Sequence, residues 1–323
     1  SRDHNCVMQN FRSGRFLTVK SNRQNLWKQR FLLYIKTGKQ QMRQNSTGKD
    51  IRSENMKIID AHLHFVPENP YFQEIAVRAE HKNTEEDLRA VYQKYGIVGG
   101  VVMGNRGVDP AAHSYPDFLK YCVGLDRDFL VSQDKKRSLD QVEANLKRED
   151  CVGIKLYPGY NKAYVTDEVY EPVYDLAKAY RKPVAIHMGQ TAGSRAYLKY
   201  SHPLTLDEAA VRHPDVTFVM CHFGNPWLMD AAAVVEKNEN VMTDLSGLLE
   251  GKIDFPKLLE QQRGYFDTLK TWISYCSQYE KFMFGTDWPL ANYGDYIGVV
   301  KWLIPEKEWE KVFYENAKRI YGF

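Results

Sequence analysis

The sequence predicts an α/β protein built on a (β/α)8 barrel, the TIM-barrel architecture. Eight short, mostly apolar runs follow one another from residue 57 onward, and longer segments with helical character separate them. Such alternation is typical of repeated βα units around a parallel sheet. The eight units take about 260 residues, close to the usual barrel size of about 250 residues. An open doubly wound sheet is the alternative.

The predicted strands are brief and nearly all apolar, as expected for strands that helices cover on both faces of a sheet. In chain order they comprise residues 57–64, 98–103, 121–125, 152–156, 184–187, 217–222, 241–245 and 282–287.

The segments between the strands carry helix signals. Residues 84–95 predict a helix that Thr84 caps at its first turn and Gly96 ends. Residues 138–148 and 168–180 predict two more helices of the same kind.

The chain divides into a basic head and an acidic body. Residues 1–55 hold 12 Lys and Arg against 3 Asp and Glu, a net charge of +9, whereas residues 56–323 carry a net charge of −6. The head has a single apolar run, residues 31–35, so we expect a disordered extension followed by the barrel domain at 56–323. An arm for nucleic acid or for an acidic membrane surface is the alternative.

Cysteine usage and hydropathy predict a cytoplasmic protein. The five cysteines are odd in number and form no CxxC pair, which favours reduced thiols. No stretch is long enough to span a bilayer, and we expect neither nucleic acid nor membrane as a partner. A homodimer stays open, because late aromatic residues such as Trp272 and Trp302 fit a subunit interface and the outer layer of a barrel equally well.

Polar side chains follow most of the predicted strands at the point where each strand ends. In a closed barrel these positions gather at the carboxyl end of the strands, where active sites form. In order they are His64, Asn105 with Arg106, Asp126 with Arg127, Lys155 with Tyr157, His187, His222, Asp244 and Asp287.

The first strand holds the most informative motif, the histidines His62 and His64. Residues i and i+2 of a strand point to the same face, so both rings can reach one ion. A histidine pair alone is a weak signal, since histidine is also common as a packed or surface residue. However, His187, His222 and Asp287 each follow an apolar run as a lone polar residue. Together these positions favour a metal site at the barrel mouth.

On these motifs the chain resembles the amidohydrolase superfamily, and within it the amidohydrolase-2 branch of aminocarboxymuconate-semialdehyde decarboxylase-like proteins. The resemblance covers residues 56–323. Its motifs are HxH at 62–64, Gly-Ile-Lys-Leu-Tyr-Pro at 153–158, single histidines at 187 and 222, and Gly-Thr-Asp-Trp-Pro at 285–289.

The resemblance implies one divalent metal, bound by His62, His64, His187 and Asp287, with His222 beside the water that the metal activates. Imidazole and carboxylate ligands suit Zn²⁺ and tolerate Mn²⁺ or Fe²⁺, and we expect zinc. Such an ion lowers the pKa of water from about 15.7 towards about 7. Asp287 and His222 are the expected catalytic residues: Asp287 accepts a proton, and His222 orients the water or stabilises charge on the substrate. A fifth ligand is the alternative role for His222.

Lys155 has two interpretations. In binuclear relatives a lysine at the end of strand four is carboxylated and bridges two metals. In the branch that this chain resembles, a free ammonium group that binds a substrate carboxylate or carbonyl is the simpler role. Tyr157 lies beyond the same strand and is expected either to line the mouth or to be an ordinary loop aromatic.

Further cations and aromatic residues after the strands favour a small anionic organic substrate. We expect Arg195, in a glycine-containing loop at 189–195, and Trp288 to contact that substrate, together with Lys155 and Tyr157. Arg195, like Arg106 and Arg127, is also explained as a solvated surface group.

The remaining polar residues have supporting roles. Asp60 is expected to be a carboxylate partner of a metal-bound histidine. Asp244 either shapes the pocket, pairs with Lys155 or caps a turn. The histidines outside the strand ends are expected on the surface: His81, His113, His202 and His213.

Three functions compete. The first is a metal-dependent hydrolase that cleaves an ester, lactone or amide of a small carboxylate-bearing molecule, and we favour it as the broader class. The second is a metal-dependent non-oxidative decarboxylase, a carboxy-lyase of an aromatic or muconate-like acid, which uses the same ligands. The third is a metal-binding barrel without catalysis; the complete ligand set argues against it.

Overall fold

The protein folds as a parallel eight-stranded barrel, seen in a computed structural model that describes residues 56–323. The expectation of a disordered head at 1–55 lies outside the described residues. All neighbouring strands pair in parallel and in chain order. The strands are β1 (Ile58–Leu63), β2 (Ile97–Met103), β3 (Leu119–Leu125), β4 (Cys151–Leu156), β5 (Val184–Ile186), β6 (Phe218–Met220), β7 (Val241–Asp244) and β8 (Phe282–Met283).

The segment after β8 closes the barrel against β1. The backbone N–H of Ala61 donates to the carbonyl of Phe284, and that of Asp287 donates to the carbonyl of His62, at N–O distances of 2.9 and 2.8 Å. These bonds place the end of the last strand beside the histidine motif of the first. The predicted (β/α)8 class is therefore confirmed, and the open doubly wound sheet is wrong.

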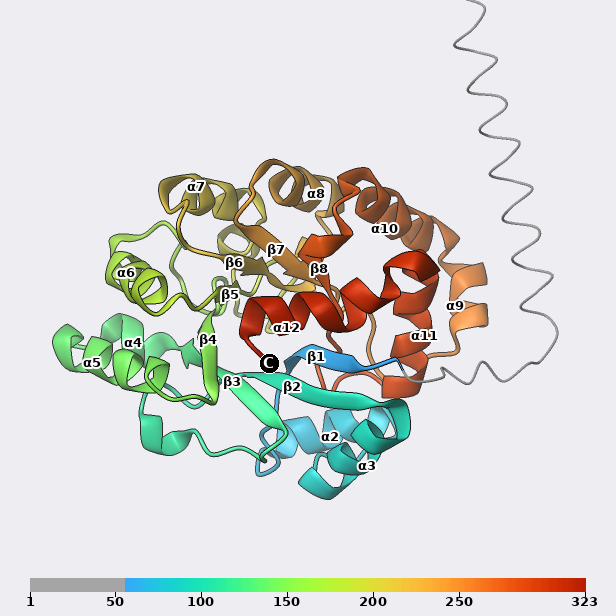
Figure 1. The fold of residues 1–323 in the computed structure, drawn as a ribbon, viewed down its shortest axis with the longest axis horizontal. Coiled ribbons are helices and arrows are strands. Elements are labelled where there is room, and N and C mark those ends of the chain that lie inside the picture. Colours follow the sequence, from blue (N-terminus) through green and yellow to red (C-terminus); the bar gives the residue numbers. More distant parts are fainter. Residues whose placement is uncertain (1–55) are drawn as a thin grey trace, which may run out of the picture. The chain divides into compact units, whose positions relative to one another are not determined.

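Helices form the outer ring around the strands (Figure 1). They are α2 (Pro70–Arg78), α3 (Glu85–Tyr95), α4 (Arg127–Val131), α5 (Lys135–Leu146), α6 (Glu171–Tyr180), α7 (Leu204–Arg212), α8 (Leu228–Lys237), α9 (Phe255–Gln261), α10 (Arg263–Cys276) and α11 (Tyr293–Leu303). The last helix, α12 (Asn316–Tyr321), packs on the inner core of the barrel instead. Within residues 56–323, no helix is both long enough and apolar enough to cross a membrane.

Helix α3 follows the sequence signals closely. The Thr84 side chain accepts a hydrogen bond from the backbone N–H of Asp87, and Gly96 ends the helix in the left-handed conformation at φ 71°. A residue without a Cβ is favoured at such an end. The other two predicted helices are α5 and α6; a single 3-10 turn at Glu168–Tyr170 precedes α6.

The inside of the barrel is a compact apolar core separate from the layer under the helices. Ala317 and Tyr321 of α12 pack onto it, and Figure 1 shows α12 lying across the strands. The strand residues of this core are Ile59, Ala61, Val101, Met103, Cys122, Val152, Ala185, Val219, Cys221, Met242 and Met283. The cysteines at 122, 151, 221 and 276 are buried free thiols, as expected.

Five strands, β1 and β5 to β8, are shorter than the sequence predicts. His187, His222 and Asp287 were expected within β5, β6 and β8 but lie just beyond them. His222 and Asp287 adopt φ angles of 61° and 59°, which a strand cannot contain. Each of these two side chains therefore sits on a backbone bend at the barrel mouth.

Candidate metal centre

One cavity of about 1030 Å³ at the carboxyl ends of the strands holds most of the predicted site residues. A single pocket is expected at this face of a (β/α)8 barrel. The predicted site residues that line it are His62, His64, Lys155, Tyr157, His187, His222 and Asp287.

A local irregularity in β1 positions its two histidines. The pairing with β2 advances by three residues between Asp60 and Leu63 while β2 advances by two, so β1 holds one extra residue there. Ala61 can therefore pack inside the barrel while the next residue, His62, lines the cavity. His64 lines the same cavity two residues further on.

His62, His64 and Asp287 form a compact donor group. Asp287 Oδ1 lies 3.4 Å from His62 Nε2 and 3.2 Å from His64 Nε2. Ligand atoms of all three residues lie within 4.8 Å of one another. This spacing suits three ligands of a single ion.

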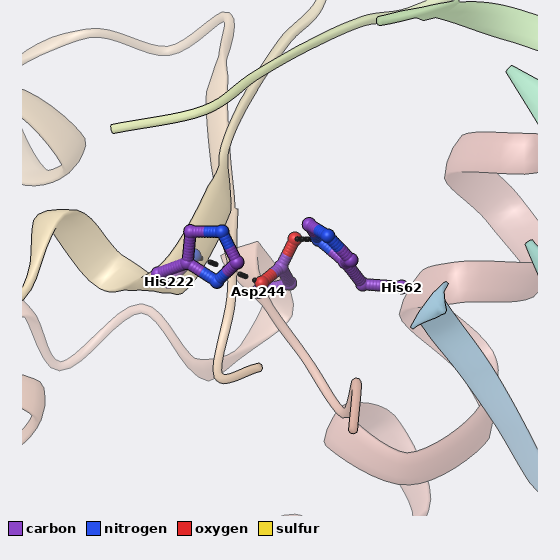
Figure 2. Close-up of side chains that lie close together, drawn as sticks. All are labelled: His62, His222 and Asp244. Carbon is purple, nitrogen blue, oxygen red and sulfur yellow. Dashed lines mark hydrogen bonds and ion pairs between the residues drawn. The ribbon is translucent and has the colours of Figure 1, made fainter. Parts of the chain in front are cut away.

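Asp244 holds the ring of His62 in the orientation that a metal ligand needs. His62 Nδ1 lies 3.0 Å from Asp244 Oδ2, and Figure 2 shows the carboxylate between His62 and His222. A carboxylate only accepts, so Nδ1 carries the proton and Nε2 keeps its lone pair. Burial lowers the pKa of His62 to about 4, although Asp244 opposes that shift, so the ring is neutral at pH 7.

A second donor group, His62, His222 and Asp244, is also compact. Here, however, the carboxylate is already satisfied. Asp244 Oδ1 accepts from the backbone N–H of His222 at 3.0 Å and from the Ser246 hydroxyl at 2.5 Å, and Oδ2 accepts from His62. Asp244 is therefore better placed to orient ligands than to be one.

His64 is oriented by a backbone carbonyl. Its Nδ1 lies 3.1 Å from the carbonyl oxygen of Met103, and the Asn105 amide lies 3.3 Å from the same nitrogen. The carbonyl only accepts, so the shorter contact fits a proton on Nδ1. His64 Nε2 then presents a lone pair to an oxygen of Asp287. Two electron-rich atoms at 3.2 Å need a cation near them.

His187 lines the cavity but stands outside the compact donor group. Its Nδ1 lies 3.2 Å from His222 Nε2. Burial lowers the pKa of His187 well below its ordinary value, and the neighbouring His222 and Lys155 lower it further. The ring is therefore neutral and competent to ligate through Nε2.

Unpartnered buried atoms test whether these residues fit a metal. His62 Nε2, His187 Nε2 and Asp287 Oδ1 are buried and make no hydrogen bond. Such orphaned groups are rare in folded proteins and cost free energy unless a water or an ion satisfies them. Two ring nitrogens and one carboxylate oxygen in one cavity, with His64 beside them, fit a borderline divalent cation such as zinc.

Gly247 lets the loop after β7 approach this group closely. A Cβ at Gly247 would lie 2.6 Å from His222 Nδ1 and 3.0 Å from Asp287 Oδ2, and the residue has φ 62°. Both facts favour glycine. Sequence analysis missed Gly247 and Ser246; their only signal is a Ser-Gly pair directly after a strand that ends in Asp244 and Leu245.

Lys155 lies in the floor of the cavity with 1% of its surface exposed. Its Nζ contacts Cys221 Sγ at 2.8 Å and lies 5.4 Å from the centre of the Tyr157 ring. Within residues 56–323 it forms no ion pair, and Asp244 binds His62 instead. The Tyr157 hydroxyl donates to the carbonyl of Gly104 at 2.7 Å, which holds its ring beside the lysine.

Two predicted substrate contacts are not in the cavity lining. Trp288 is fully buried, with its ring 4.5 Å from the His81 ring and 5.3 Å from the Tyr293 ring, because the chain turns at Asp287 and directs the next side chain outward. Arg195 is exposed and lies directly after the stretch 190–194 that lines the cavity. The structure places neither side chain in the cavity lining, and a substrate contact for Trp288 or Arg195 stays a prediction.

The other loop arginines also lie outside the cavity lining. Arg106 pairs with Glu68 at 2.8 Å, and Arg127 is exposed at the start of α4. Lys155 is thus the single lysine or arginine among the described residues that line the cavity.

Two supporting predictions need correction. Asp60 does not touch the His62 ring; it accepts from the His62 backbone N–H at 3.2 Å and from the Thr286 hydroxyl at 2.6 Å, so it holds β1 against the segment before Asp287. His113 is buried rather than on the surface, because its Nε2 bonds to the carbonyl of Gly107 and its ring stacks at 4.7 Å on Tyr121.

Comparison with known proteins gives the family. The amidohydrolase family model matches residues 59–323, almost the whole barrel. The chain belongs to the amidohydrolase family. The resemblance seen in the sequence is thereby confirmed.

Several solved structures have the same fold as this amidohydrolase, at low sequence identity. One is 2,6-dihydroxybenzoate decarboxylase from Rhizobium, with 16% identity, 83% of this chain and 99% of that chain covered, and a TM-score of 0.60. Another is a probable 2-pyrone-4,6-dicarboxylic acid hydrolase from Acinetobacter baumannii, with 15% identity, 83% and 100% coverage, and a TM-score of 0.54.

A third neighbour of this amidohydrolase is an amidohydrolase from Burkholderia multivorans with bound zinc, with 16% identity, 82% and 99% coverage, and a TM-score of 0.57. The search of curated proteins gave no significant match. At these identities the neighbours establish the fold, and they include both hydrolase and decarboxylase names.

Proposed function

We propose that this amidohydrolase is a metal-dependent enzyme that acts on a small, carboxylate-bearing organic molecule. The observation that carries the proposal is the set of buried, unpartnered atoms in the cavity: His62 Nε2, His187 Nε2 and Asp287 Oδ1. With His64 they supply three imidazoles and a carboxylate for one divalent ion. Zinc suits this set best, and manganese or iron are the alternatives.

The bound ion would supply Lewis acidity, lowering the pKa of a water molecule and polarising substrate oxygens. The chain itself supplies orientation and proton transfer. Asp287 Oδ1 faces His62 and His64, whereas its Oδ2 lies towards Gly247. One carboxylate can therefore ligate through one oxygen and take up a proton at the other.

Lys155 is the group that we assign to the carboxylate of the substrate. It is the cation of the cavity lining, it is buried, and a thiol rather than an acid is its neighbour. An ammonium group without a countercharge in a buried site favours an anionic ligand strongly. The aromatic side chains of Tyr71, Phe72, Tyr157 and Tyr160 complete an apolar lining suited to a flat ring.

Hydrolysis of an ester, lactone or amide is the first candidate reaction. Asp287 would accept the proton of the attacking water and return it to the leaving group. His222 lies in the same lining, beside the candidate ligand His187, and would help to orient the attacking water. Burial lowers the pKa of His222, so it would act as a neutral imidazole.

Non-oxidative decarboxylation is an equal second candidate. Neighbours with the same fold include 2,6-dihydroxybenzoate decarboxylase and 5-carboxyvanillate decarboxylase. In that reaction the same ligand set would hold substrate oxygens while an acid protonates the ring carbon that loses CO₂. Lys155 would again hold an anionic group of the substrate.

The first experiment measures metal content by elemental analysis of protein purified without added metal. We expect about one ion per chain in the parent, as a mononuclear site requires, and loss of that ion in His62→Ala. Two ions per chain would favour carboxylated Lys155 and a bridged pair. No ion in the parent would contradict the proposal and favour a barrel without metal chemistry.

An isotope experiment separates the two reactions. Dicarboxylated pyrones and dihydroxybenzoates are incubated with the metal-loaded protein, once in H₂¹⁸O and once in D₂O. Hydrolysis places ¹⁸O in the product carboxylate and releases no CO₂. Decarboxylation releases CO₂ and places deuterium on the ring carbon. Turnover that persists after chelation would contradict metal dependence in either case.

A further inference from the structure

Four buried side chains, one of them the candidate ligand His187, form one hydrogen-bonded series. Ser246 Oγ lies 2.5 Å from Asp244 Oδ1 and 2.9 Å from His222 Nδ1, and His222 Nε2 lies 3.2 Å from His187 Nδ1. The exposed fraction is 0% for Asp244 and Ser246 and at most 8% for the two histidines. The contacts are therefore largely shielded from bulk water.

The direction of every bond in the series follows from its first member. A carboxylate only accepts, so the Ser246 hydroxyl donates its single hydrogen to Asp244. Ser246 Oγ must then accept from His222, which places the proton of that ring on Nδ1. The carbonyl of Ser246 lies farther from the same nitrogen, at 3.2 Å against 2.9 Å for the hydroxyl, and fits the same tautomer.

These bond directions also determine the tautomer of His187, a candidate metal ligand. With its proton on Nδ1, His222 presents the lone pair of Nε2 to His187, so His187 must donate from Nδ1. The lone pair of His187 then lies on Nε2, the buried atom that has no partner in the cavity. The same carboxylate accepts from His62 Nδ1 through its other oxygen. Asp244 thereby leaves Nε2 unprotonated on two histidines, His62 on β1 and His187 directly after β5.

A local turn does not account for this arrangement. The backbone N–H of Ser246 already donates to Asp244 Oδ1 at 3.1 Å, which is sufficient for an Asx turn. The hydroxyl contact with the His222 ring adds nothing to such a turn. This contact is explained if the Ser246 hydroxyl connects the Asp244 carboxylate to the imidazole rings of His222 and His187.

We propose that Ser246 is a positioning residue that acts through His222 to hold His187 in the tautomer that binds the metal. The proposal rests on the proposed function, in which His187 is a ligand. It also gives His222 a role in the metal-free protein: its ring nitrogens are both engaged, one by Ser246 and one by His187. Loss of a hydrogen-bond partner behind a metal-bound histidine typically weakens metal affinity about 10–100-fold.

The first test measures zinc affinity by competition with a chromophoric chelator. We expect Ser246→Ala to bind zinc about 10-fold more weakly than the parent, at the low end of that range because two side chains separate it from the ion. Ser138→Ala is the matched control: Ser138 is also buried and hydrogen-bonded, but to Ser132 and Asp134 at the start of α5. Parent-like affinity in Ser246→Ala would overturn the proposal.

A double-mutant cycle tests whether the effect passes through His222. In a His222→Ala background the series is already interrupted, so Ser246→Ala should cause no further loss of zinc affinity. Losses that add in the double variant would show that Ser246 acts on the site independently, which would also overturn the proposal. Far-ultraviolet circular dichroism of each variant verifies that the barrel is folded.

A measurement on the metal-free parent needs no variant. Two-bond ¹H–¹⁵N correlation spectra of ¹⁵N-histidine protein distinguish the two neutral tautomers. We expect the proton on Nδ1 in both His187 and His222, and a proton on His187 Nε2 would refute the series. If the parent bound no metal, the proposed function would fail, while this spectrum would still decide whether the series exists.

Discussion

The two halves of the cavity wall differ in how many hydrogen bonds hold their side chains. We call one half the metal half; it consists of His62, His64, Asp244 and Asp287. Hydrogen bonds to residues on the strands or directly beyond them fix the rings of His62 and His64 and the carboxylate of Asp244. The substrate half, formed by Lys155, Tyr160 and the stretch 190–194, has few such bonds. The amine of Lys155 contacts one thiol, and the Tyr160 hydroxyl accepts one bond, from the Ala192 N–H at 2.8 Å.

This difference separates the chemistry from the recognition of the substrate. Ligands placed on a rigid scaffold can meet an ion without reorganisation, which favours tight binding of the metal. Loops with exposed side chains, such as 192–194, adapt more readily and vary without cost to the fold. Changes in the metal half should therefore affect metal content, and changes in the substrate half should affect the Michaelis constant.

Removal of a ligand from the metal half should have the largest effect. His62→Ala deletes a ring that Asp244 orients and that lies 3.4 Å from Asp287, so we expect zinc affinity to fall by more than about 100-fold. Equilibrium dialysis with elemental analysis measures it. His202→Ala, at a partly exposed histidine near Asp230, is the control. A parent-like metal content in His62→Ala would contradict the assignment of His62 as a metal ligand.

Asp287→Asn should separate metal binding from proton transfer. The amide keeps an oxygen for the ion but cannot take up a proton, so we expect kcat to fall about 100–10,000-fold, the usual contribution of a positioned acid or base. Metal content should fall less than in His62→Ala. Steady-state kinetics with a substrate found in the isotope experiment measures the effect. Full activity in Asp287→Asn would be incompatible with the proton role.

Lys155→Met should change the substrate half alone. The variant keeps the buried volume but loses the charge, and a hydrogen bond to a charged group is worth about 1.5–3 kcal/mol, so KM should rise about 10–100-fold for a carboxylate substrate. Metal content should stay unchanged. Lys162→Met, at an exposed lysine beside the Tyr197 ring, controls for loss of surface charge. Loss of metal in Lys155→Met would instead support a carboxylated lysine that bridges two ions.

The positions of the candidate metal ligands were largely predictable because the barrel itself brings strand ends together. His62, His64, His187 and Asp287 needed only the order of the strands and the polar residue at each end to be placed in one cavity. Strand bounds that were wrong by a few residues did not matter for this purpose. The sequence pattern thus indicates which elements meet at the mouth.

The sequence could not show where side chains point once the backbone leaves a strand. Trp288 follows a residue with positive φ and turns into the outer layer, although its position in the sequence is adjacent to Asp287. Arg195 lies in a loop whose path no pattern specifies. The carboxylate that orients His62 is Asp244, 182 positions away, rather than the nearby Asp60. Contacts between distant segments of this kind depend on three-dimensional packing.

His113 provides the smallest effect and a comparison outside both halves. Burial lowers the pKa of His113 below its usual value, so the unfolded chain binds a proton at a higher pH than the folded protein does. Stability is therefore complete above the unfolded pKa of about 6.5 and declines as the pH falls below it. In His113→Gln the loss of thermal stability between pH 7 and pH 5 should be smaller than in the parent, while metal content should not change. Differential scanning calorimetry at both values measures it, with His202→Gln as the control. An unchanged acid sensitivity in His113→Gln would show that the burial of His113 does not contribute to the acid sensitivity of the protein.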